Sequence, residues 1–274
     1  MCGIAGFCLA PTERNNIDRR LLTAALLDQI ESRGRDATGL ATWQRGGKKI
    51  SVRKRNVSAT EYIRSGRVAE QVNRGTCTAI MHTRYATQGK PERNSNNHPI
   101  MRPPVVGVHN GHVSNDADLF KRLNVKRSAQ VDSEAIFALL AHAPEPVDEL
   151  LPRVQGGAAV AWLDKREARD EWGPTLHLAR IRRSPLAVGQ TNAGSVIFAS
   201  TMPHLLKACD TARIDLDWTL DVGEAERMDV RRGVITTYQD IPGVDKAPAL
   251  RPMRYLDGTT DDEHAGALSS WTLG

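Results

Sequence analysis

The chain has 274 residues, of which 40% are hydrophobic, so it can bury a core and its composition argues against wholesale disorder. Its formal net charge of +5 is modest and demands no nucleic-acid partner, and no apolar run approaches the roughly 20 residues of a membrane span. The 4 cysteines lack C-x-x-C spacing, and the N-terminus lacks the basic start of a signal peptide. We therefore expect a reduced, cytoplasmic protein that needs no metal, membrane or nucleic acid.

The first part of the chain predicts strands and helices joined by short turns and one long loop. In chain order, the periodicity predicts a strand at 3–9, a helix at 17–31 with Asn16 as its N-cap, strands at 40–44 and 49–54, a helix at 59–72 and a strand at 76–83. A glycine-containing loop over 32–39 precedes the two strands, which form a hairpin around residues 46–47. A long polar loop covers residues 84–99.

The second part of the chain is richer in strands. The patterns predict a strand at 104–110 ending at Asn110-Gly111, helices at 115–123 and 132–142, strands at 157–163, 175–181, 185–189 and 195–200, a helix at 203–209 and two strands within 225–238. After Asp240 the pattern dissolves into a proline-containing, polar stretch. We expect one domain over residues 1–240, of α+β rather than doubly wound type, and a peripheral, flexible tail over 241–274.

Cys2 is the first candidate for chemistry. Initiator methionine is normally removed before a small residue, which would give Cys2 both a thiol and a free α-amine. Because the amine titrates near ~8 and a free thiol near ~8.5, the amine can accept the thiol proton at neutral pH. The alternative is a small apolar cysteine that begins a strand.

Two loops supply further candidates. Arg33-Gly34 lies in the segment RGRDATG, which is either a helix-to-strand turn or a device that orients the N-terminal residue. Arg84 lies where a strand opens into the polar loop, and its guanidinium could bind a substrate carboxylate through two parallel hydrogen bonds. The alternative for Arg84 is a surface arginine.

The segment 109–111 and Asp132 have structural and functional interpretations as well. Asn110-Gly111 is typical of a tight turn, but its side-chain amide and backbone N–H could also stabilise an oxyanion by about 3–4 kcal/mol per donor. Asp132 could cap the following helix or hold a ligand ammonium.

Six short motifs occur in a fixed order along the chain. They are Cys2-Gly3-Ile4, RG-x-D-x-x-G at 33–39, HTRYAT-x-G at 82–89, N-x-HP at 96–99, HNG at 109–111 and DSE at 132–134. In this order they resemble the class II glutamine amidotransferases, which are N-terminal-nucleophile hydrolases. The resemblance covers about residues 2–238, and the ordered set is specific although each motif alone is weak.

Within that family, the chain most resembles the glutaminase half of glucosamine-6-phosphate synthase, and next that of amidophosphoribosyltransferase. Two positions depart from the synthase pattern, because Tyr85 and Gln88 stand where that pattern has Trp and His. The resemblance implies a four-layer αββα sandwich. It also implies hydrolysis of L-glutamine to glutamate and ammonia through a γ-glutamyl thioester on Cys2, without a cofactor.

The resemblance also implies a role for each candidate residue. Cys2 is the nucleophile, Asn110 and Gly111 form the oxyanion hole, Arg84 binds the α-carboxylate, Asp132 binds the α-ammonium, Tyr85, Thr87 and His98 line the pocket, and Arg33 with Gly34 positions Cys2. Residues after about 240 leave no room for a synthase domain, so we expect an ammonia donor for a separately encoded synthase. The alternatives are a self-contained amidohydrolase acting on another γ-glutamyl or amide substrate, and a catalytically silent regulatory module. The intact set of candidate residues argues against the last.

Overall fold

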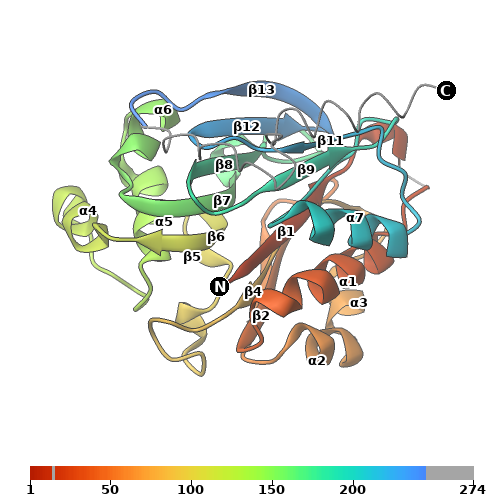
Figure 1. Ribbon diagram of the computed structural model, residues 1–274, viewed down its shortest axis with the longest axis horizontal. Helices are drawn as coiled ribbons and strands as arrows, with labels where there is room; N and C mark the ends of the chain where they lie inside the picture. The colour runs from red at the N-terminus through yellow and green to blue at the C-terminus, as the bar shows by residue number, and fades with distance from the viewer. Residues whose placement is uncertain (14–15, 245–274) are drawn as a thin grey trace, which may run out of the picture. The chain divides into compact units, whose positions relative to one another are not determined.

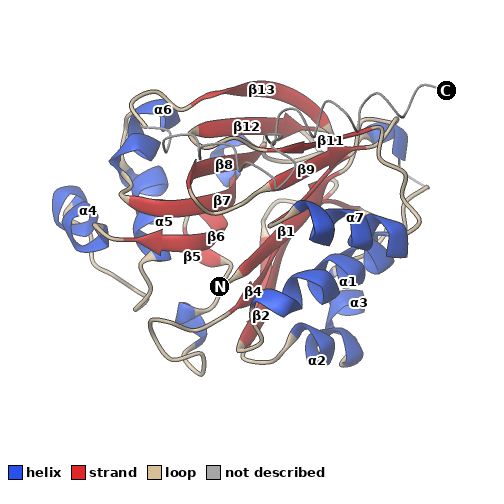
Figure 2. Cartoon of the chain, viewed as in Figure 1, coloured by secondary structure: helices blue, strands red, loops and turns tan. Residues whose placement is uncertain are grey.

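The computed structural model describes residues 1–13 and 16–244. Two sheets lie face to face, and helices cover the outer face of each sheet (Figures 1 and 2). All the strand pairs in the described residues are antiparallel. This arrangement confirms the predicted α+β class and the four-layer αββα sandwich.

Sheet A has seven strands in the order β11-β9-β10-β1-β4-β2-β3. Their bounds are β1 Gly3–Cys8, β2 Ala37–Gln44, β3 Ser51–Arg55, β4 Thr76–Arg84, β9 Ala187–Gln190, β10 Val196–Ala199 and β11 Trp218–Asp221. The N-terminal strand β1 lies inside the sheet, paired with β4 so that Gly3 faces Thr83. Cys2 therefore lies beside the point where β4 ends at Arg84.

Sheet B has six strands in the order β13-β12-β8-β7-β6-β5. Their bounds are β5 Ile100–Arg102, β6 Val105–Val113, β7 Gly156–Asp164, β8 Leu176–Arg182, β12 Glu226–Arg231 and β13 Val234–Asp240. Strand β6 contributes to the contacts between the sheets, because it contacts both β1 and β4.

Helices complete the two outer layers. Sheet A is covered by α1 Arg19–Ile30, α2 Ala59–Arg64, α3 Arg67–Gln71 and α7 Met202–Thr211, and sheet B by α4 Asp116–Leu123, α5 Ser133–His142 and α6 Val147–Leu150 (Figure 2). Single 3-10 turns occur at η1 Pro11–Glu13, η2 Glu31–Arg33, η3 Asn94–Asn96, η4 Leu151–Arg153 and η5 Lys165–Glu167.

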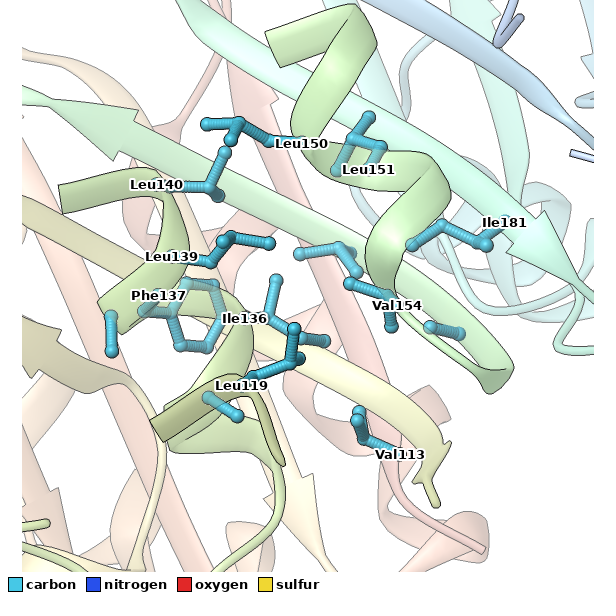
Figure 3. Packing of buried hydrophobic residues seen from close by; sticks show 14 of the residues in the cluster. Val113, Leu119, Ile136, Phe137, Leu139, Leu140, Leu150, Leu151, Val154 and Ile181 are labelled. Atoms are coloured by element: carbon cyan, nitrogen blue, oxygen red, sulfur yellow. The ribbon is translucent and has the colours of Figure 1, made fainter. Parts of the chain in front are cut away.

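Three buried apolar clusters hold the four layers together. One lies between the sheets, one between sheet A and its helices, and one between sheet B and its helices. Figure 3 shows part of the last cluster, in which Ile136 and Leu139 of α5 and Leu151 and Val154 form one apolar layer. Because apolar burial drives packing, these clusters hold the helices against the sheets and the two sheets against each other.

Several predicted boundaries are wrong. The N-cap of α1 is Asp18 rather than Asn16, because the Asp18 carboxylate accepts hydrogen bonds from the backbone N–H groups of Arg20 and Leu21. The helix predicted at 59–72 is two helices separated at Gly66, which has a left-handed φ of 76°. The strand predicted to end at Asn110-Gly111 runs on to Val113.

The sequence patterns also missed short elements. These are β5, β11 and α6, which have 3, 4 and 4 residues. Elements of this length are too short to show a hydrophobic period.

The predicted boundary at residue 240 stays a prediction. Ile241 and Val244 are described and pack in the cluster outside sheet B. The rest of the predicted tail, residues 245–274, lies outside the described residues. Within the described ranges, no helix is long and apolar enough to cross a membrane.

Candidate active site

Cys2 lies directly before β1, beside the residue at which β4 ends, and the label N in Figure 1 marks this end of the chain. Its thiol contacts the backbone of Tyr85, the residue that follows β4. The Tyr85 N–H donates to Cys2 Sγ at 3.4 Å, and the Tyr85 carbonyl oxygen lies 3.6 Å from Sγ. The chain thus brings the N-terminal motif and the HTRYATQG motif together at one sulfur atom.

Arg33 and Gly34, which follow α1, contact Cys2 and the end of β4. Arg33 Nε donates to the carbonyl oxygen of Cys2 at 2.8 Å. A Cβ on Gly34 would lie only 2.3 Å from the carbonyl carbon of Arg84, so a glycine is required for this close approach. Asp36 completes the contact, because its carboxylate accepts from the Ala86 N–H at 2.7 Å. The loop over 33–36 therefore holds both Cys2 and the start of the 84–99 loop.

The guanidinium of Arg84 is buried and engaged by its own loop. Nη1 donates to Asn97 Oδ1 at 2.8 Å, while Nη2 donates to the carbonyl oxygens of Gln88 and Gly89. A guanidinium can donate two parallel hydrogen bonds to a carboxylate from either of two edges, and each edge includes one hydrogen of Nη2. In this conformation neither edge is free for a carboxylate.

Asn97, to which the sequence motifs assign no role, has several contacts in this loop. Besides accepting from Arg84, its side chain donates to the Pro91 carbonyl oxygen at 2.7 Å, and its own carbonyl accepts from Lys54. The NNHP segment is one of the ordered motifs, and the resemblance gives a role only to its histidine, His98. Nothing in the sequence connects Lys54 with this loop, because their contact depends on the fold.

The three residues predicted to line the pocket differ in their exposure. Tyr85 and Thr87 are exposed, with 55% of Tyr85 accessible. His98 is buried, and its ring stacks on His82 with centroids 4.0 Å apart. Burial lowers the pKa of His98 well below its ordinary value, so the ring is neutral. Neither of its ring nitrogens has a hydrogen-bond partner among the described residues.

Asn110 and Gly111 lie within β6, opposite Ala159 and Ala158 of β7, rather than in a turn. Gly111 has a φ of 144°, and a Cβ there would lie 1.9 Å from the carbonyl oxygen of Gly157. Asn110 is buried, and its Nδ2 donates to no partner among the described residues. A buried amide donor without a partner costs free energy unless a ligand uses it, so this atom is suited to an oxyanion.

Asp132 caps α5, as the structural interpretation predicts. One carboxylate oxygen accepts from the Ser133 N–H at 2.9 Å and the other from the Val113 N–H at 2.6 Å. The second oxygen also lies 3.4 Å from His112 Nδ1. The carboxylate is close enough to Cys2 that its charge helps to raise the pKa of the thiol. Its predicted role in holding an ammonium stays a prediction.

The protonation of Cys2 is set mainly by its surroundings. Burial raises the pKa of the thiol above its ordinary value, although the Tyr85 backbone, the N-terminal ammonium and Arg84 oppose that effect. The thiol is therefore protonated at neutral pH, and it needs a base before it can act as a nucleophile.

A pocket of about 580 Å³ opens beside this corner, lined in part by Met1, Arg33, Tyr85 and His204. Among the residues that the structure describes, no group of three or more His, Cys, Asp or Glu side chains could hold a metal ion. Around the Cys2 thiol the structure places the Arg33 guanidinium, the Tyr85 backbone and the charges of Arg84 and Asp132.

Sequence comparisons relate this chain to one family. Residues 82–207 match the family model described as the glutamine amidotransferase domain. The chain is 31% identical over 224 residues to a glutamine-fructose-6-phosphate aminotransferase (isomerizing) of Pyrobaculum aerophilum, which covers 75% of this chain and 34% of that protein. It is 33% identical over 220 residues to the protein of the same name from Helicobacter pylori, covering 77% of this chain and 34% of that protein. The chain thus spans about a third of the length of these curated relatives.

Solved structures show the same fold. The chain superposes on glutamine phosphoribosylpyrophosphate amidotransferase from B. subtilis, complexed with ADP and GMP, with a TM-score of 0.69 and 17% identity over 92% of this chain and 50% of that one. A glutamine aminotransferase class-II domain protein from Silicibacter pomeroyi gives a TM-score of 0.52 and 15% identity over 90% of this chain and 100% of that one. At these identities the likeness establishes the fold alone.

Proposed function

We propose, from the premise that this chain carries a class II glutamine amidotransferase domain, that it hydrolyses L-glutamine to glutamate and ammonia with Cys2 as nucleophile. The observation that supports this most strongly is the meeting of distant motifs at one thiol. Arg33 binds the Cys2 carbonyl, Tyr85 contacts the sulfur, and the charges of Arg84 and Asp132 both act on the thiol. Such convergence of a nucleophile with charged groups is typical of a catalytic site.

The proposed reaction has two halves. The Cys2 thiol gives its proton to a base while its sulfur attacks the side-chain carbonyl carbon of glutamine. The Asn110 amide and the Gly111 N–H stabilise the tetrahedral oxyanion. The carbon–nitrogen bond then breaks, the proton passes to the departing ammonia, and a γ-glutamyl thioester remains. Water attacks this thioester, releases glutamate and restores the thiol.

The base in this proposal is the α-amine of Cys2, which exists only after Met1 is removed. While Met1 remains, the nitrogen of Cys2 is a peptide nitrogen and the free amine is one residue, about 3.8 Å, further along the chain. Met1 is 77% exposed and so is accessible to an aminopeptidase. The raised pKa of the thiol makes such a base necessary at neutral pH.

The destination of the ammonia is also part of the proposal. The curated relatives extend well beyond the third of their length that this chain matches. We propose that the synthase that uses the ammonia is a separate chain, docked so that ammonia is captured before it is protonated and lost. The alternatives are a self-contained amidohydrolase on another γ-glutamyl or amide substrate, and a silent regulatory module.

The direct test is turnover of glutamine by the wild type and by Cys2→Ala. The substitution should abolish ammonia release and leave the fold unchanged, and Cys2→Ser should be severely impaired because a hydroxyl is a weaker nucleophile. Cys8→Ala is the matched control, because Cys8 is a buried cysteine at the far end of β1, the strand that begins directly after Cys2. Equal turnover by Cys2→Ala and the wild type would refute the assignment.

Two further experiments separate the alternatives. A wild type that is inactive on glutamine but active on another amide would favour the amidohydrolase. Capture of a synthase from native cells would support the separate partner.

A further inference from the structure

Lys54 lies on β3, at the edge of sheet A, with its ammonium turned toward the 84–99 loop. Nζ donates to the carbonyl oxygen of Asn97 at 2.6 Å and to that of Pro99 at 3.0 Å. These two carbonyls flank His98, so one side chain spans the end of the loop. Both contacts are charge-assisted hydrogen bonds, which are stronger than neutral ones.

The surroundings of this ammonium are unfavourable to its charge. Burial, and to a smaller extent the charge of the nearby Arg84 guanidinium, lowers the pKa of Lys54 to about 8. No carboxylate among the described residues forms an ion pair with Lys54. Burying a lysine ammonium beside another cation costs free energy. The two hydrogen bonds from Lys54 to backbone carbonyls of the loop offset that cost.

The contact connects Lys54 to Arg84 through one residue. The backbone of Asn97 accepts from Lys54, while the side chain of Asn97 accepts from Arg84 and donates to Pro91. His98, which follows Asn97, packs closely against β2 of sheet A. A Cβ on Gly39 of that strand would lie 2.0 Å from the His98 carbonyl oxygen. Asn97 also donates its backbone N–H to the Asn94 carbonyl oxygen, and among its four hydrogen-bond partners in the described residues Lys54 alone lies outside the 84–99 loop.

We propose that Lys54 is a positioning residue for glutamine binding, which holds Asn97 where its side chain orients the guanidinium of Arg84. This inference rests on the proposed function and adds a residue to it. Lys54 contacts the backbone of Asn97 and Pro99 rather than Cys2, so it should act on binding through Arg84 and not on the chemical step. Its loss should loosen the end of the loop and leave Arg84 without a fixed orientation.

The kinetic test is Lys54→Met, which keeps the unbranched stem and removes the ammonium. The KM for glutamine should rise by about tenfold, with kcat within about twofold of the wild type, because only uniform binding is lost. Lys54→Arg, which retains donors and charge, should recover part of the loss. Lys49→Met is the matched control, since Lys49 is exposed and precedes the same strand. In an Arg84→Met background, Lys54→Met should add little to KM, because its effect passes through Arg84.

Hydrogen exchange on the same variants separates this inference from the proposed function. In Lys54→Met, amides within 94–99 should exchange faster while the strands of sheet A keep their protection. A wild type without glutamine turnover would overturn the proposed function. Wild-type turnover with unchanged KM and unchanged exchange in Lys54→Met would overturn the role of Lys54 alone. A variant that lost protection throughout sheet A would also contradict it, because Lys54 would then be holding the fold.

Discussion

Arg84 Nη1 donates to the side-chain oxygen of Asn97 at 2.8 Å, within the loop that follows β4. The residue predicted to bind the substrate carboxylate is therefore engaged by its own loop in this conformation. Glutamine binding through a two-pronged contact requires the carbonyl oxygens of Gln88 or Gly89 to release Nη2. Substrate binding and loop rearrangement should therefore be coupled.

The first prediction concerns binding of the glutamine α-carboxylate and α-ammonium. Arg84→Lys should raise the KM for glutamine by about tenfold or more with a small change in kcat. The reason is that the lysine ammonium cannot donate the two parallel hydrogen bonds that a planar guanidinium gives to a carboxylate. Asp132→Asn should raise KM as well. Asn keeps one oxygen to cap α5, but its NH2 group cannot replace the second acceptor, so Asp132→Asn should also lower the melting temperature by a few degrees. Steady-state kinetics and thermal unfolding check both, and a change confined to kcat would contradict the assigned roles.

The second prediction concerns the oxyanion. Asn110→Ala should lower kcat by roughly 10²–10³ with little change in KM, because the amide is needed most when the oxyanion forms. Its Nδ2 has no partner in the described part of the chain, so removing it should not destabilise the fold through a lost hydrogen bond. If Asn110→Ala raised KM and left kcat unchanged, the oxyanion role would be wrong.

The third prediction follows from the engagement of Arg84. Adding glutamate or an unreactive glutamine analogue should reduce protease cleavage within residues 84–99, because the bound carboxylate orders a rearranged loop. Arg84→Lys should show a smaller reduction at the same ligand concentration. Equal cleavage with and without ligand would contradict coupling between the loop and the substrate.

Much of the fold could be predicted because its elements have clear periods. Strand β4 is buried along its whole length, and β1 likewise, so their continuous apolar runs indicated buried strands. The pairing of β1 with β4, which places Cys2 beside Tyr85, joins residues 83 positions apart. No local pattern encodes such a contact, and only the ordered motifs of the family indicated it.

The candidate site was predicted less completely than the fold. The sequence indicated Arg33, Arg84 and Asn110 as single residues with two interpretations each. It did not indicate that Asn110-Gly111 continues a strand, because the same dipeptide is typical of hairpin turns. Lys54 was missed because an alternating strand of charged residues, SVRKR, looks like a solvated edge.

The fourth prediction concerns a buried histidine far from Cys2 in the chain. His177 on β8 lies between two carboxylates, with Nδ1 2.7 Å from Asp229 Oδ1 and Nε2 2.9 Å from Glu167 Oε2. Its ring stacks on Trp162. Burial by itself lowers the pKa of His177, but the hydrogen bonds to Asp229 and Glu167 outweigh it and raise the pKa to about 9.

Because this pKa is higher in the folded chain than its ordinary value of 6.5, the charged imidazole stabilises the fold. That contribution is complete below about pH 6.5 and is lost as the pH rises through about 9. His177→Gln should lower the free energy of unfolding by roughly 3 kcal/mol near pH 6, and the difference from the wild type should shrink toward pH 10. The exposed His142→Gln is the control. A difference that stayed constant over this range would contradict a charged His177.

The measurement that tests the central claim most directly is covalent labelling with a glutamine analogue that carries an electrophilic side-chain carbon. Intact-mass analysis should show one label per chain, and peptide mapping should place it on Cys2 of a chain that has lost Met1. Excess glutamine should slow the labelling, and Arg84→Lys should slow it at low analogue concentration. A label on Cys8, Cys77 or Cys209, or full glutamine turnover by protein that retains Met1, would contradict the account.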